Sequence, residues 1–430
     1  MTTTTHRHYS PLRCATLAFA ISFLPVAHAQ PSASLAAPNS AVQPTVEVIH
    51  FWVSQSEKKA LNVYRQAWKS LGGKWNDLPT KDKQAELTIV SDRIANGYPP
   101  TVMQWFGNEG SQELPAMGVV QDIEEVATAD HWREFLPKNV VDRISYKGRV
   151  YFAPTNLHAE NWLWTSRKIF DQLKLPSPTS WDSLLDSAAK IKAAGYIPIA
   201  RGSGTWETSL IFHDIIYSFY GAEAYVRLMS GSDPQAAMKP EMLKALGILR
   251  RLSAFVEPAK PGKTWADATL SVGRGRAGMQ FMGDWAKGEL TEAGLVADKD
   301  FRCTLAPGTE SIYFVVVDAF AFPITSNAND RRSQLLFARQ VMNTDNQLAF
   351  NRVKGSIPVR TDIQRNNLDA CGKIGLDLIS RKGGQVAVQS LTMPSQMSKG
   401  WTDVVADFLN DSKMTPESAQ RQLTEVLMQK

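Results

Sequence analysis

Residues 45–52 read TVEVIHFW, a short stretch from which the fold can be worked out in both directions. Apolar and polar side chains alternate in it and β-branched residues are frequent, so it predicts a β-strand. Polar residues follow, and residues 57–71 then predict a helix with one apolar face, formed by Leu61, Tyr64, Ala67 and Trp68. Gly72 and Gly73 end this helix.

The rest of the chain continues the alternation of strands and helices. Residues 81–95 predict a second helix and residues 101–105 a short buried strand. Further strands are expected at 197–200, 277–282 and 314–322, and further helices from 181, at 401–409 and at 416–428. This order predicts an α/β fold. A chain of 430 residues is too long for one ordinary core, so two domains are expected.

The N-terminus has the pattern of an export signal. Arg7 and Arg13 precede an apolar run at 14–26, and Ala27-His28-Ala29 is a small-x-small cleavage site. We expect a mature chain from Gln30, with 30–44 as a flexible arm. The apolar run is too short to span a bilayer, so no stable membrane insertion is expected.

Composition narrows the class of partner. Hydrophobic residues make up 43% and charged residues 21% of the chain, as in soluble globular proteins. Without Arg7 and Arg13 the chain carries 45 basic and 42 acidic residues, interspersed, which excludes a nucleic-acid signature. Two cysteines then remain, Cys303 and Cys371, which form either one disulfide or two free buried thiols.

Asp318 is the single acid in the apolar run 314–322, FVVVDAFAF. A carboxylate inside such a strand costs several kcal/mol unless it is paired or hydrogen-bonded. It is therefore either a ligand-facing acceptor at a strand end or a structural acid satisfied by backbone N–H groups or an arginine. The residues alone leave both readings open.

No template of catalysis or metal binding is present. The chain has no G-x-x-x-x-G-K-[ST], H-E-x-x-H, G-x-S-x-G or C-x-x-C motif. The histidines of the mature chain stand at no metal-ligand spacing; they are His50, His131, His158 and His213. Paired carboxylates of the glycosidase kind follow no spacing rule and stay open. Several of the 12 tryptophans adjoin an acid or amide, a combination that suits a sugar ring and its hydroxyls.

Several segments, in this order, are those of a known family. They are HFW at 50–52, NGYPP at 96–100, YKG at 146–148, PTNLH at 154–158, NWLW at 161–164, TSWD at 179–182, MGDWAKG at 282–288, APG at 306–308, VDAF at 317–320 and KGSIPVR at 354–360. On them the chain resembles family 1 extracellular solute-binding proteins of carbohydrate ABC transporters. It looks closest to periplasmic glucose/mannose-binding proteins of Gram-negative bacteria and Thermus.

The resemblance implies a two-lobed α/β periplasmic binding protein fold, with discontinuous lobes joined by hinge strands. We expect residues 45–153 and 305–350 in the N-terminal lobe, and 154–304 and 351–430 in the C-terminal lobe. The resemblance further implies a periplasmic monomer, without cofactor or metal, that holds a mono- or small oligosaccharide between the lobes. Closure of the lobes around the sugar would be read by an ABC permease.

The resemblance also assigns residues. Phe51 and Trp52 match the aromatic pair that flanks the sugar, and Glu57 a nearby acid. Trp206 and Trp285 match aromatics of the second lobe. Asp318 matches the acid that accepts sugar hydroxyls, Lys354 a lysine that donates to them, and Cys303 with Cys371 a disulfide of the nearest relatives.

The chain departs from the glucose binders at three places. Phe106, with Trp105 before it, stands where they carry Lys or His, so we add both residues to the expected site. Residues 386–392 contain no histidine where the relatives have a His-Gly pair, and 79–84 replace a Gly-rich turn. Lost donors can shift specificity by orders of magnitude, so glucose is one candidate ligand among several.

Two other functions use the same residues. An exported glycoside-acting enzyme would use acids such as Glu57, Asp284 and Asp318 and would turn over aryl glycosides. A sugar sensor would dock its closed form on a chemoreceptor or sensor kinase. The sensor needs the same fold and ligand as a transport protein, so a pull-down with and without sugar is what separates them.

Overall fold

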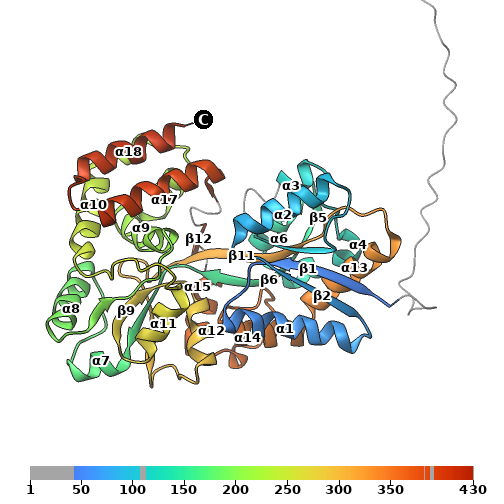
Figure 1. The fold of residues 1–430 in the computed structure, drawn as a ribbon, viewed down its shortest axis with the longest axis horizontal. Helices are drawn as coiled ribbons and strands as arrows, with labels where there is room; N and C mark the ends of the chain where they lie inside the picture. The colour runs from blue at the N-terminus through green and yellow to red at the C-terminus, as the bar shows by residue number, and fades with distance from the viewer. Residues whose placement is uncertain (1–42, 107–112, 382, 388–391, 430) are drawn as a thin grey trace, which may run out of the picture. The chain divides into compact units, whose positions relative to one another are not determined.

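A computed structural model of the chain describes residues 43–106, 113–381, 383–387 and 392–429. The export signal, its cleavage site and nearly all of the arm lie outside these residues. Residues 43–430 form one compact unit with two large β-sheets, each covered by helices, and with two large hydrophobic clusters (Figure 1). The predicted α/β fold with two lobes is confirmed.

The first lobe is built on a six-stranded sheet. Its strands run in the order β12-β11-β3-β1-β2, and β6 pairs with β11 in addition. Their bounds are β1 Thr45–His50, β2 Lys74–Pro79, β3 Val102–Phe106, β6 Phe152–Ala159, β11 Tyr313–Ala321 and β12 Gln385–Ala387. β1 is parallel to β2 and β3, while β11 is antiparallel to β3 and β6.

The second lobe is built on a four-stranded sheet of order β10-β7-β9-β8. Its strands are β7 Trp162–Ser166, β8 Ile197–Ile199, β9 Ala277–Phe281 and β10 Phe301–Leu305. A hairpin of β4 Ser145–Tyr146 and β5 Arg149–Val150 stands apart. The strands predicted at 45–52, 101–105, 197–200, 277–282 and 314–322 are therefore confirmed within one to two residues at each end.

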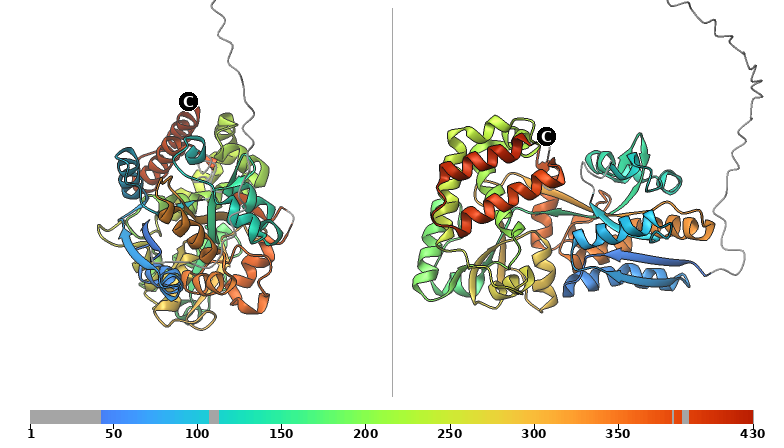
Figure 2. Two further views of the ribbon diagram at one scale, coloured as in Figure 1. Left: turned by 90° about the vertical axis from the view of Figure 1, so that its right-hand side faces the viewer. Right: turned by 45° about the horizontal axis from the view of Figure 1, so that its top comes forward.

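Helices cover both sheets. α1 and α14 pack against each other below the first sheet, and α17 and α18 pack on α9 and α10 in the second lobe (Figures 1 and 2). The helix bounds are α1 Gln55–Ser70, α2 Lys83–Ala95, α3 Glu113–Ala116, α4 Glu124–Ala129, α5 Trp132–Phe135, α6 Lys138–Ile144, α7 Arg167–Gln172, α8 Trp181–Ala193, α9 Trp206–Met229, α10 Pro240–Ser253, α11 Trp265–Gly273, α12 Trp285–Glu292, α13 Ala328–Met342, α14 Thr344–Lys354, α15 Ala370–Ile379, α17 Ser395–Asn410 and α18 Pro416–Met428.

Two of the connections that pass between the lobes, β6 to β7 and β10 to β11, lie next to each other. Asn161, in the first connection, ties the two together. Its Nδ2 donates to Thr309 Oγ1 and to the Ile312 carbonyl, each at 3.0 Å, and its Oδ1 accepts from the Phe314 N–H at 3.0 Å. Asn161 is fully buried, so these bonds satisfy an amide that would otherwise be costly to bury.

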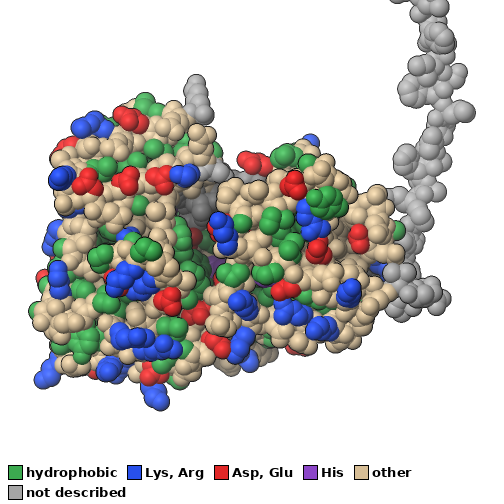
Figure 3. All heavy atoms as spheres, in the orientation of Figure 1, with side chains coloured by type: hydrophobic (Ala, Val, Ile, Leu, Met, Phe, Trp, Pro, Cys, Tyr) green, Lys and Arg blue, Asp and Glu red, His purple; other side chains and the backbone are tan. Residues whose placement is uncertain are grey.

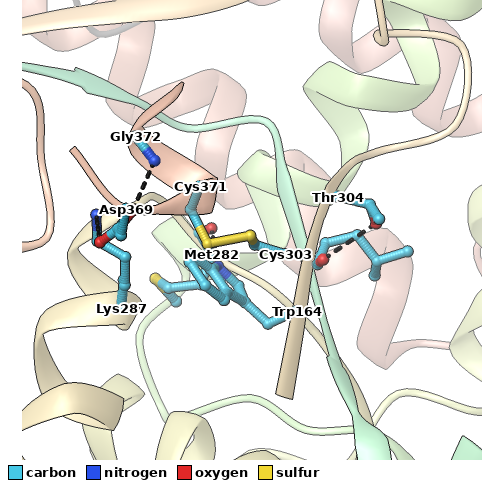
Figure 4. Close-up of a disulfide and its surroundings, with 9 residues drawn as sticks. Trp164, Met282, Lys287, Cys303, Thr304, Asp369, Cys371 and Gly372 are labelled. Atoms are coloured by element: carbon cyan, nitrogen blue, oxygen red, sulfur yellow. Dashed lines mark hydrogen bonds and ion pairs between the residues drawn. A yellow bond between two sulfur atoms is a disulfide. The ribbon is translucent and has the colours of Figure 1, made fainter. Parts of the chain in front are cut away.

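A disulfide links β10, the strand before the second connection, to α15. Cys303 on β10 is bonded to Cys371 on α15, which confirms the expected pairing (Figure 4). Beside it Lys287 forms an ion pair of 2.8 Å with Asp369, and Asp369 caps α15 by accepting from the Gly372 N–H. The lobe boundaries given above stay predictions, because contacts unite residues 43–430 into one unit.

Candidate functional site

The start of α1 presents an acid in a fixed orientation. Ser54 is the N-cap, and its hydroxyl accepts from the Glu57 N–H at 3.3 Å. In return Glu57 Oε2 accepts from the Ser54 N–H at 3.1 Å, which completes a capping box. One carboxylate oxygen is thus used by the helix, and Oε1 is left for other partners.

That second oxygen meets a buried lysine. Lys354 ends α14, is 2% exposed, and places Nζ 3.2 Å from Glu57 Oε1. The same Nζ lies 5.9 Å from the ring centre of Trp52 and 6.0 Å from that of Trp285, within the range of cation–π attraction. Trp52 and Glu57 are far from Trp285 and from Lys354 along the chain, and the fold brings the four residues into one cluster.

Asp318 belongs to the same cluster. It lies on β11, is 2% exposed, and its Oδ2 is 3.1 Å from Nε2 of His158 on the neighbouring strand β6. The other ring nitrogen of His158, Nδ1, contacts Oδ1 of Asp284 at the start of α12. Asp318 is thus satisfied by a histidine, a partner that the sequence did not indicate.

The charges explain the titration of these groups. Burial alone would lower the pKa of His158, but the Asp284 and Asp318 carboxylates more than offset this and the nearby Lys354, so its pKa is raised. Burial alone would raise the pKa of Asp318, yet His158 and Lys354 hold it below its usual range. Around neutral pH the cluster therefore contains an anionic Asp318.

Aromatic rings border the polar cluster on the second lobe. The ring of Trp285 meets His158 edge to face at 5.2 Å, and Trp206 at the start of α9 lies 6.3 Å from Trp285. Trp206 is 39% exposed, the most open of the expected aromatics whose side chains the structure describes. The surface of residues 43–430 is hollowed between the two lobes (Figure 3).

The remaining expected site residues lie on the first lobe. Trp52 is 1% exposed and packs on Phe320 and Phe350, with ring centres 5.6 and 5.4 Å apart, so it is part of the core as well as of the lysine's surroundings. The Phe51 N–H donates to Gln104 Oε1 at 3.1 Å. Trp105 is half-buried, with Lys83 Nζ 5.7 Å from its ring centre.

Phe106 is placed by its backbone, because its side chain is outside the described residues. It pairs with Asp318 in the antiparallel ladder of β3 and β11. The departure from the glucose binders at position 106 is therefore directly opposite the central acid.

Another buried acid, Glu86, lies near Gln104. Glu86 on α2 is 1% exposed, and burial raises its pKa to about 9, although the Gln104 N–H and Lys83 act in the opposite direction. Within the described part of the chain, Glu86 Oε1 and Gln104 Nε2 have no hydrogen-bond partner. Glu86 is consequently a neutral acid at pH 7.

Replacing Glu86 with glutamine is expected to increase the free energy of unfolding at pH 7 by about 1–3 kcal/mol. The unfolded chain ionises Glu86 above about pH 4.5, whereas the native state keeps the proton to about pH 9. Stability therefore falls between these values in the wild type, and this loss is absent from the variant. Urea unfolding at pH 5 and pH 8 measures it, and an equal slope of stability with pH in both proteins would refute the assignment.

No group of three or more His, Cys, Asp or Glu side chains that could hold a metal ion occurs among the residues the structure describes. Among the same residues, no helix combines the length and the apolar character needed to cross a bilayer. His158 and its bond to Asp284 are the part of the cluster that sequence reasoning missed as site residues. The only signal was indirect, since both residues occur in the segments shared with the resembling family.

Comparisons with known proteins agree with this architecture. A family model described as "Bacterial extracellular solute-binding protein" matches residues 68–330. A "Probable sugar-binding periplasmic protein" of Mesorhizobium japonicum is 32% identical over 390 residues, covering 89% of this chain and 93% of the relative. A protein of the same name from Rhizobium meliloti is 33% identical over 345 residues, covering 80% and 82%.

Solved structures show the same fold at low identity. A chitin oligosaccharide binding protein superposes with a TM-score of 0.77 at 16% identity, covering 90% of this chain and 98% of its own. The bacterial solute receptor AcbH, described as having an exclusive preference for β-D-galactopyranose, gives a TM-score of 0.76 at 17% identity, covering 89% of this chain and 97% of its own. By the extent of the family match and of the sequence relatives, the chain belongs to the bacterial extracellular solute-binding proteins.

Proposed function

We propose that the mature protein captures a sugar between its two lobes and delivers it to the permease of an ABC importer. The observation that carries the proposal is the polar cluster of Glu57, Lys354 and Asp318 bordered by Trp285 and Trp206. Buried charged groups bind hydroxyls strongly, and aromatic faces suit the C–H side of a sugar ring. Relatives named as sugar-binding proteins support the same ligand class.

Each side chain receives a role in this proposal. Asp318 and Glu57 accept sugar hydroxyls, and Lys354 donates to them. Trp206 and Trp285 offer stacking faces from the second lobe. From the first lobe we add Phe51, Trp52, Trp105 and Phe106, of which Trp52 also supports the core.

The ligand is proposed as glucose, another monosaccharide, or a larger or less polar glycoside that reaches Trp105 and Phe106. Trp105 is half-buried, with Lys83 Nζ 5.7 Å from its ring centre, so this edge combines an aromatic face with a cation. No chemistry is proposed, since Asp318 and Asp284 are engaged by the same histidine and the family consists of binding proteins. We therefore prefer the binding protein to the glycoside-acting enzyme as the proposed function.

The cellular setting is part of the proposal. The leader with its cleavage site after Ala29 and the relatives named as periplasmic support export to the periplasm. We further propose that the protein is a monomer whose closed form docks on permease subunits. Size-exclusion chromatography with light scattering on the mature chain tests the oligomeric state.

A titration of the mature protein with a sugar panel tests the function. The panel contains D-glucose, D-mannose, D-galactose, D-xylose, maltose and raffinose, followed by tryptophan fluorescence and calorimetry. Saturable binding of at least one sugar is expected, with a fluorescence change from Trp206 or Trp285. The absence of binding to every mono- and oligosaccharide would overturn the sugar assignment, and turnover of aryl glycosides would favour the enzyme.

Substituting Phe106 with lysine is expected to strengthen D-glucose binding about tenfold, because a charged donor bonds hydroxyls more strongly than a neutral one. Position 106 pairs with Asp318 in the β-ladder, so the new ammonium group would be introduced directly opposite the central acid. Calorimetry of Phe106→Lys against Phe106→Leu, an apolar control, measures the change. Equal glucose affinity in both variants would contradict a role of this position in specificity.

A further inference from the structure

His158 occupies the centre of the buried cluster. It lies on β6, and its side chain is 2% exposed. One ring nitrogen contacts Asp284 and the other lies 3.1 Å from Asp318, so a single imidazole stands between two buried carboxylates. Trp285 closes the edge of the ring at 5.2 Å.

Asp284, the carboxylate on the Nδ1 side of the ring, is held by several hydrogen bonds. Asp284 Oδ2 accepts from the Tyr313 hydroxyl at 2.9 Å and from the Ala159 N–H at 3.2 Å. Because Oδ1 contacts His158, this acid has partners on both oxygens. Asp284 therefore fixes the ring plane, and Nε2 lies 3.1 Å from Asp318 Oδ2.

The proton count decides what the ring can do. A neutral imidazole has one N–H and can donate to only one of the two carboxylates, whereas an imidazolium donates to both. Lys354 and Glu160 also interact electrostatically with the ring. The side chains of Asp284 and Asp318 are each 4% exposed and flank the same ring. Two buried carboxylates in these positions favour the imidazolium form of His158.

We propose that His158 is a positioning residue for the ligand: as an imidazolium it holds the Asp318 carboxylate in the orientation that accepts sugar hydroxyls, and ligand affinity falls when the ring loses its proton. The inference rests on the proposed function, in which Asp318 contacts the sugar. His158 itself acts through Asp318.

An amide donor also faces Nε2 in the structure, and only an unprotonated Nε2 can accept from it. Asn156 Nδ2 lies 2.6 Å from His158 Nε2, and the same amide group donates to Ser356 Oγ at 3.0 Å. With Nε2 as the acceptor for Asn156, the ring would turn a lone pair toward Asp318 and repel it. Loss of the proton thus exchanges an attraction on Asp318 for a repulsion.

The direction of the pH dependence follows from the carboxylates. Although burial lowers the pKa of His158, Asp284 and Asp318 raise it above its usual value, so the ring is protonated below that pKa and affinity is at its maximum there. Above it affinity decreases. Glu160 also titrates near neutral pH, because burial raises its pKa to about 8, so its contribution must be separated experimentally.

The experiment combines histidine NMR with sugar titrations between pH 5.5 and 9. The imidazole resonances of ligand-free protein give the pKa of His158, assigned by their loss in His158→Gln. D-glucose, D-galactose and D-xylose are the probes for affinity. Glu160→Gln removes the second titrating group, and His131→Gln is the matched control on an exposed histidine.

We expect His158 to titrate above its usual value of 6.5 in the wild type and lower in Asp318→Asn, which lacks one of the two flanking charges. The affinity of the best-bound probe should fall at least tenfold across this range in the wild type, in Glu160→Gln and in His131→Gln. His158→Gln should bind at least tenfold more weakly at pH 6, with a flat profile. Wild-type affinity and pH profile in His158→Gln would refute the positioning role.

The two hypotheses fail in different ways. If neither the probes nor any other sugar binds the wild type, the proposed function is refuted. The role of His158 in sugar binding is then refuted as well. If sugar binds but His158 titrates below 6.5 in the ligand-free protein, only the imidazolium is refuted. If the fall in affinity with rising pH is absent in Glu160→Gln, Glu160 causes the pH dependence and the inference is refuted, while the proposed function stands. This outcome can be measured even if His158→Gln does not fold.

Discussion

Replacing Asp318 with alanine is expected to weaken sugar binding by about 2–4 kcal/mol, which is about 30-fold to several hundred-fold in Kd. The carboxylate is 2% exposed and its pKa is held below the usual range by His158 and Lys354, so it is an ionised acceptor in a dry surrounding. Its removal leaves the ligand hydroxyls without an acceptor. It also leaves His158 and Lys354 without the negative charge beside them. Calorimetry with the best-bound sugar of the panel measures the loss.

Two further variants make this result specific. Asp318→Asn keeps the shape but loses the charge and is expected to fall between wild type and alanine. Asp130→Ala, which removes a half-buried carboxylate paired with Arg339 on the first lobe, should bind as the wild type does. Unchanged affinity in Asp318→Ala, together with reduced stability, would return Asp318 to a purely structural acid.

The two readings of Asp318 turn out to be connected. The residue was expected either to face a ligand or to be satisfied within the fold by backbone N–H groups or an arginine. It is satisfied within the fold, but by His158 and by the charge of Lys354. Neither partner is near Asp318 along the chain, so no local pattern could have identified them.

Local patterns did predict the elements that bear the site. The strand ending at His50, the capped helix after it and the apolar strand around Asp318 follow from alternation and periodicity. β2 was missed, and the predicted order strand–helix–helix–strand was wrong at this point. Its sequence KWNDLP contains Asn76, Asp77 and Pro79, which are unfavourable in strands, yet pairing with β1 overrides this propensity.

Trp52 shows the limit of reading single aromatic residues. An aromatic beside polar residues predicts a sugar platform, and Trp52 does lie within 5.9 Å of Lys354 Nζ. The same ring fills the core between Phe320 and Phe350, which only the packing of β11 and α14 reveals. Trp206, in contrast, leaves 39% of its surface open. Exposure, which sequence does not give, is what distinguishes the two.

Removing the disulfide by the double substitution Cys303→Ser and Cys371→Ser is expected to lower the free energy of unfolding by about 2–4 kcal/mol. The bond closes a loop with a sequence separation of 68, so its loss frees a long segment of the unfolded chain. That segment includes β11 and α14, and therefore both Asp318 and Lys354. Urea unfolding of the oxidised wild type and of the variant measures the difference.

The native site is expected to survive this change better than stability does. Asp318 and Lys354 are held by His158 and Glu57, neither of which depends on the sulfur atoms, so sugar affinity of the folded variant should stay within about threefold of wild type. Dithiothreitol should destabilise the wild type and leave the double variant unchanged. Equal stability of the two oxidised proteins would mean that the packing of α15 on β11, together with the Lys287–Asp369 ion pair, already confines the loop.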